Sequence, residues 1–120
     1  MEDSIACVGF HLLEEWCGQN FQWSEPVAMI AIPLSAGDCR VSLDLLPLGG
    51  TEIPVAPRFY LNEVLLPPER IEWSKEKISI RIQVLSDGLQ RLAWSCPPFL
   101  SPGDRRDLGL PLHRVSLQRL

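Results

Sequence analysis

The stretch Lys77-Ile78-Ser79-Ile80-Arg81-Ile82-Gln83-Val84 carries a β-branched apolar side chain at every second position, with a polar side chain before each one. This period of two is typical of a β-strand that turns one face to a hydrophobic core and the other to water. Val41-Ser42-Leu43-Asp44-Leu45 repeats the alternation. Because the apolar face of such a strand needs a second layer to cover it, these stretches predict two packed sheets.

Eleven prolines interrupt the chain and favour short strands over helices, because proline removes an N–H donor and crowds the preceding turn. We expect an all-β protein whose 120 residues form a single domain. Its predicted fold is an antiparallel β-sandwich of the jelly-roll or galactose-binding-like type, with about eight or nine short strands. The expected strands are Ala6–Leu12, Phe21–Ser24, Val27–Leu34, Arg40–Leu46, Val55–Leu61, Arg70–Trp73, Lys77–Leu85, Leu89–Cys96 and His113–Leu120.

Turn residues predict how some strands are connected. Ser86-Asp87-Gly88 separates two alternating runs, and Asp-Gly readily adopts the positive φ angles of a tight hairpin. The flanking strands are therefore expected to be antiparallel neighbours. Asn62 marks a second turn. The one segment with helical spacing of apolar residues, His11–Cys17, predicts a short helical turn.

Charge and hydropathy argue against several classes of partner. Fifteen acidic and eleven basic residues give a formal charge of −4 without a basic stripe, so nucleic-acid binding is not expected. No apolar run is long enough to span a bilayer, so we expect no membrane insertion. The start, Met1-Glu2-Asp3-Ser4, is acidic, unlike a signal peptide. The expected location is the cytoplasm.

Cysteines and histidines give no sign of a cofactor, a metal site or catalysis. The four cysteines lack C-x-x-C spacing, and only two histidines accompany them, so reduced, mostly buried thiols are expected. Neither G-x-S-x-G nor a phosphate-binding glycine loop occurs in the sequence. We therefore expect a protein that is not an enzyme. The four cysteines are Cys7, Cys17, Cys39 and Cys96.

Two of the four tryptophans are candidates for ligand binding. Trp16 and Trp23 lie among polar residues, and an exposed indole face stacks well on a sugar ring. Core packing is the alternative for both. Trp73 and Trp94 alternate in phase with apolar neighbours and are predicted to lie in the core.

Three further features bear on binding. Arg58 and Tyr60 share one face of a predicted strand, where they could hold a polar ligand or simply face water. Asp104-Arg105-Arg106-Asp107-Leu108-Gly109 is the densest charged cluster, and it favours a structural latch over an anion site.

The segment Val27–Ile32 is apolar on both faces. It predicts a strand covered on both sides or one at an interface, which includes a homodimer.

The two ends of the chain carry segments that look like family motifs. Gly9-Phe10-His11, Glu14-Glu15 and Asn20-Phe21-Gln22-Trp23-Ser24 stand near the N-terminus, and the cluster Asp104–Gly109 precedes the last strand. This arrangement resembles a jelly-roll-like accessory domain that is attached to bacterial glycosyltransferases and polysaccharide-biosynthesis proteins. The sequence departs from the family pattern at Gln22, where arginine is frequent, and at Ser24, where threonine is usual.

The resemblance implies specific roles and partners. Trp23 would be the motif tryptophan, and Asp104, Arg106, Leu108 and Gly109 would form the latch. The implied function is a non-catalytic module that binds a glycan or a glycosyltransferase partner protein. A structural homodimerisation domain without a small-molecule ligand is the alternative, and a small hydrolase is a third hypothesis.

Overall fold

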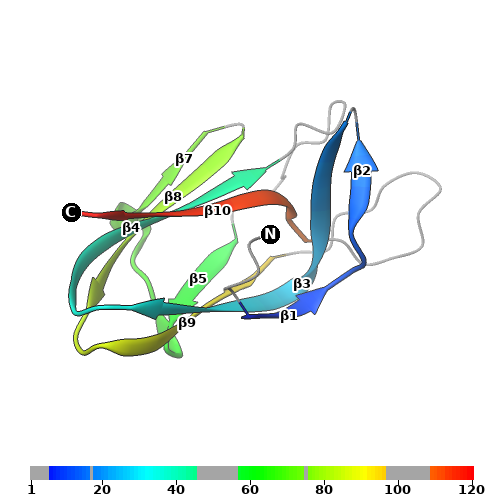
Figure 1. Ribbon diagram of the computed structural model, residues 1–120. Helices are drawn as coiled ribbons and strands as arrows, with labels where there is room; N and C mark the ends of the chain where they lie inside the picture. Colours follow the sequence, from blue (N-terminus) through cyan, green and yellow to red (C-terminus); the bar gives the residue numbers. More distant parts are fainter. Residues whose placement is uncertain (1–5, 17, 46–56, 75, 97–108) are drawn as a thin grey trace.

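The computed structural model describes residues 6–16, 18–45, 57–74, 76–96 and 109–120. In these segments the chain forms a 10-stranded antiparallel β-structure and one short 3-10 helix (Figure 1). The all-β, antiparallel prediction is confirmed. The elements are β1 (Ala6–Phe10), β2 (Glu14–Trp16), β3 (Gln19–Leu34), β4 (Gly37–Leu45), β5 (Arg58–Leu61), β6 (Val64–Leu65), η1 (Pro68–Arg70), β7 (Ile71–Trp73), β8 (Lys77–Val84), β9 (Gly88–Ser95) and β10 (Pro111–Arg119).

The long strand β3 belongs to both layers of a sandwich (Figure 1). Its residues 27–34 pair with β1 and β9, and β5 and β6 extend this first layer beyond β9. Its residues 22–23 pair with β10, which begins the second layer of β10, β4, β8 and β7. The predicted strands Phe21–Ser24 and Val27–Leu34 are thus one strand. Pro26, which breaks the alternation in the sequence, stands where β3 passes between layers.

The core lies between the two layers and is built from alternate strand positions. On β8, every second side chain is buried, as the alternation predicts: Ile78, Ile80, Ile82 and Val84. The fully buried Trp94 faces them from the first layer, with its ring centroid 6.1 Å from that of Phe59. Burying each large apolar side chain contributes about 1.5–3 kcal/mol, so this inner face dominates the stability of the sandwich.

The predicted hairpin at Asp87-Gly88 is wrong. Strand β8 pairs with β4 in the second layer, whereas β9 pairs with β3 in the first. The β3–β4 connection lies directly opposite, and Ala36 N donates a 2.7 Å hydrogen bond to Asp87 Oδ1. The two connections therefore form a double corner at which a two-stranded ribbon folds over onto itself, which lets both of its halves bury their apolar faces. Gly88 supplies a positive φ of 139° at this corner.

Two other local predictions have opposite outcomes. The turn at Asn62 is confirmed: Asn62 and Glu63 adopt φ angles of 47° and 73° between β5 and β6, as in a two-residue type I′ hairpin. The helical turn at His11–Cys17 is wrong, because Glu14–Trp16 forms β2 and pairs with β3. A segment of this length has little helical stability of its own, so strand pairing prevails.

Candidate functional site

The two family-like motifs meet at the side chain of Ser24, which is fully buried. Its hydroxyl accepts hydrogen bonds from Leu110 N at 2.8 Å and from Trp94 Nε1 at 3.2 Å, and it donates to Glu25 O at 2.8 Å. Backbone bonds reinforce the junction, since Gly109 N donates to Ser24 O at 2.7 Å and Ser24 N donates to Leu110 O at 2.8 Å. One hydroxyl thus joins the first motif, the last motif and the central tryptophan.

Gly109 allows this close approach because it has no side chain. A Cβ placed there would overlap Ser24 Oγ and the carbonyl oxygen of Glu25. The other residues of the expected latch, Asp104, Arg106 and Leu108, lie outside the residues that the structure describes. The contacts of Gly109 are contacts within the fold, and they point to a structural role at this position.

For Trp23 the structure decides between the two alternatives, an exposed indole and a core position. Trp23 is only 5% exposed, and its ring meets Phe21 edge-on at 6.2 Å between centroids. Its faces are therefore closed to a sugar from solution, and the core alternative holds. The side chain of Trp16 lies outside the described part. Trp73 was expected in the core but is 44% exposed, because β7 is the last strand of its layer and leaves the indole at an edge.

Arg58 and Tyr60 both lie on the outer face of the first layer. Tyr60 belongs to a line of directly opposed residues that crosses all five strands of that layer. We call this line the apolar row. It consists of Val8 on β1, Met29 on β3, Ala93 on β9, Tyr60 on β5 and Leu65 on β6.

The apolar row is part of a wider uncovered surface. Val8 and Leu65 at its two ends are 63% and 55% exposed, and Val27, on the same side of β3, is 67% exposed. Val27 is opposite Ser95, which in turn is opposite Arg58. We call the apolar row together with Val27 and Arg58 the docking face. Contiguous exposed apolar surface of this kind typically marks an interaction site.

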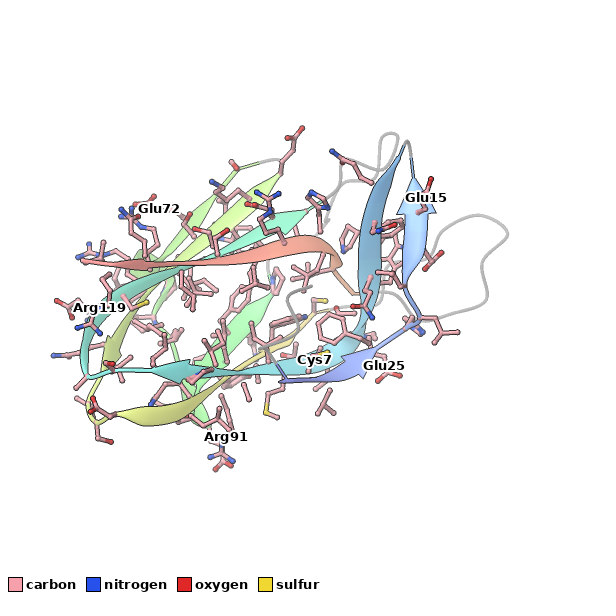
Figure 2. All side chains as sticks on the ribbon, in the orientation of Figure 1. Cys7, Glu15, Glu25, Glu72, Arg91 and Arg119 are labelled. Carbon is pink, nitrogen blue, oxygen red and sulfur yellow. The ribbon has the colours of Figure 1, made fainter. Side chains whose placement is uncertain are left out.

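The outer face of the second layer has the opposite character. A line of directly opposed polar residues crosses it, formed by Ser116, Ser42, Ser79 and Glu72. Figure 2 shows Glu72 on the outer side of the second layer and Arg91 projecting from the outer side of the first. The polar face is what a solvated sheet requires, so the apolar character of the docking face is specific to one side of the molecule.

The docking face carries one uncompensated positive charge. Arg58 is exposed, and within the described segments it makes neither an ion pair nor a side-chain hydrogen bond. Arg91, on the same side of the sheet, is 3.5 Å from Glu63 through its Nη1 atom. A surface that covers the docking face would therefore need a carboxylate opposite Arg58.

The sequence predicts that Val27–Ile32 is either covered on both sides or lies at an interface. In the structure, the two sides of this strand differ in burial. The inward residues Ala28, Ile30 and Ile32 are buried. On the outer side Val27 is 67% exposed, whereas Ala31 is only 7% exposed. The remaining members of the docking face come from strands far apart in the sequence. Sequence reasoning found only the contribution of β3 and the pair Arg58 and Tyr60, because the register between strands is set by tertiary structure.

Comparison with protein-family models and with curated proteins gives no match to this sequence. The resemblance to glycosyltransferase accessory domains therefore stays a prediction based on the motifs. Among the described residues, no helix has the length and apolar character needed to cross a membrane. The same residues contain no group of three or more His, Cys, Asp or Glu side chains that could hold a metal ion.

Proposed function

We propose that this protein is a non-catalytic accessory module that docks onto a partner protein of polysaccharide biosynthesis through the docking face. The observation that carries the proposal is the apolar row, which crosses five strands: its end residues Val8 and Leu65 are 63% and 55% exposed, and its central residues are half-buried. A flat row of valine, methionine, tyrosine and leucine suits a protein surface better than a sugar, because it offers much apolar area and few hydrogen-bonding groups.

The charge on the docking face indicates what kind of surface the partner presents. Arg58 lacks a partner within the described part of the chain, so a complementary surface is apolar at its centre and carries an aspartate or glutamate opposite Arg58. The motif resemblance supplies the class of partner, a glycosyltransferase or another polysaccharide-biosynthesis protein. The module has the role of a scaffold that positions or stabilises that enzyme.

Titration of the purified protein against each glycosyltransferase encoded in the same genome tests the proposal. Val27→Asp and Leu65→Asp each place a charge in the proposed interface and should weaken binding at least tenfold. Leu85→Asp is the matched control, since Leu85 is 86% exposed and lies between β8 and β9, off the docking face. We expect Leu85→Asp to bind as the wild type does.

Sedimentation of the isolated chain separates a partner protein from a second copy. The proposal predicts a monomer whose docking face is free for the enzyme. A dimer that Val27→Asp and Leu65→Asp dissociate would assign the face to a second copy of this chain and overturn the proposal. Binding of no glycosyltransferase, or binding that survives both substitutions, would overturn it as well.

A further inference from the structure

A polar hollow of about 500 Å³ lies at one end of the second layer, away from the docking face. Its walls come from the start of β3, the end of β4, the β7–β8 connection and β10. Pockets that hold small molecules typically have volumes of about 300–1,000 Å³. We call it the polar hollow; its lining includes Gln19, Asp44, Ser74, Glu76, Lys77 and His113.

Backbone hydrogen bonds fix the walls of the polar hollow. Leu45 N donates to Glu76 O at 2.7 Å, which ties the end of β4 to the β7–β8 connection. Ser74 N donates to Lys77 O at 2.9 Å, and Ser74 Oγ donates to the same carbonyl at 3.1 Å. The backbone of these walls is therefore fixed by the fold, so a ligand has to order only the side chains that it contacts.

Asp44 carries an unsatisfied acceptor in this hollow. Its Oδ1 atom is buried and has no hydrogen-bond donor in the described part of the chain. The nearest cation, Lys77 Nζ, is 4.0 Å from that oxygen, beyond hydrogen-bond distance. A buried carboxylate oxygen without a donor is costly. The side chain of Asp44 is 24% exposed, so a ligand hydroxyl can reach the carboxylate from its exposed side, where it would donate to Asp44 and accept from Lys77.

His113 and Gln19 add further hydrogen-bonding groups. His113 Nδ1 lies 2.9 Å from the carbonyl oxygen of Asn20. Since a carbonyl only accepts, Nδ1 holds the proton in the neutral ring, and Nε2 is left as an acceptor. Gln19 offers an amide donor and an amide acceptor. The hollow therefore presents both kinds of group to a ligand.

The charge of the lining selects against ions. Among the described lining residues, Asp44 and Glu76 supply two carboxylates and Lys77 supplies one ammonium, so an anionic sugar or a phosphate would meet net negative charge from these groups. A cation would have to lie beside Lys77. A neutral ligand with several hydroxyl groups avoids both penalties, because each hydroxyl donates and accepts.

We propose that the polar hollow binds a neutral sugar residue, with one hydroxyl donating to Asp44 and accepting from Lys77 and another hydroxyl accepting from Gln19. The site uses none of the residues of the docking face. It also differs from the sugar platform that the sequence suggested at Trp16 and Trp23. A module with both surfaces could hold a glycan while it is docked on a partner protein.

Titration of the 120-residue chain with glucose, galactose, mannose and N-acetylglucosamine, followed by two-dimensional amide NMR, tests this assignment. At least one sugar should shift the amide signals of Gln19, Asp44, Lys77 and His113. Asp44→Asn removes a charge-assisted hydrogen bond and should weaken binding about tenfold. Gln19→Ala, which truncates an exposed side chain at the start of β3, should also weaken binding and does not threaten the fold.

Two comparisons make the outcome decisive. Arg58→Glu changes the docking face alone, so it should leave the sugar titration unchanged. This variant therefore separates a failure of the sugar site from a failure of the proposed docking. Glucuronate should bind more weakly than glucose because of its charge. The proposal is overturned if none of the four sugars shifts those signals, if Gln19→Ala and a folded Asp44→Asn both bind as the wild type does, or if glucuronate binds more tightly.

Discussion

Replacing Ser24 by alanine tests the junction that joins the two ends of the chain. The substitution removes the hydroxyl that accepts from Leu110 N and Trp94 Nε1, and it leaves both donors buried. An unsatisfied buried donor costs about 1–3 kcal/mol, so the free energy of unfolding should fall by about 2–6 kcal/mol. Small domains are stable by about 5–15 kcal/mol. The loss should therefore lower Tm by about 10 °C or more.

Urea unfolding followed by tryptophan fluorescence and circular dichroism measures this effect. Ser79→Ala is the matched control, because Ser79 lies on the polar outer face and makes no side-chain hydrogen bond with the described residues. In a Trp94→Phe background one of the two donors is absent, so Ser24→Ala should cost less than in the wild type. If the cost of Ser24→Ala lies within about 0.5 kcal/mol of the cost of Ser79→Ala, the junction does not stabilise the fold as we infer.

Two further predictions concern positions near this junction and the thiols. Gly109→Ala should destabilise the protein strongly, because the added Cβ overlaps Ser24 Oγ and Glu25 O; thermal melting checks this, and an unchanged Tm would contradict the close packing. Burial raises the pKa of the Cys96 thiol, which lowers its thiolate fraction at any given pH. Iodoacetamide should therefore label the exposed Cys7 before Cys96. Peptide mass spectrometry measures the order of labelling, and the reverse order would show that Cys96 is more accessible than its packing indicates.

The sequence predicts strand faces well because burial alternates with a fixed period. The alternation from Ile78 to Val84 corresponds position by position to buried and outward residues on β8. The same pattern does not reveal which strand lies beside which. Asp87-Gly88 is a favourable sequence for a tight hairpin turn. The β3–β4 connection at Ala36 bends at the same place, however, so the two-stranded ribbon folds over at a double corner. That outcome depends on two connections far apart in the sequence.

Binding surfaces are harder to predict than strand faces, for the same reason. Arg58 and Tyr60 were found from their spacing on one strand, but Val8, Met29 and Leu65 join Tyr60 only through the register of separate pairings. The polarity of nearby residues left two alternatives open for Trp23, an exposed indole and a core position. Trp23 is buried despite polar neighbours in the sequence, because β3 turns their side chains to the other side.

The most direct test of docking is hydroxyl-radical footprinting of the protein, free and bound to the glycosyltransferase that it recognises. Met29 and Tyr60 are readily oxidised residues at the centre of the docking face, and Trp73 on β7 is an exposed reference in the other layer. The proposed docking predicts that oxidation of Met29 and Tyr60 falls in the complex while that of Trp73 is unchanged. Protection of Trp73 with Met29 and Tyr60 still fully reactive would contradict it.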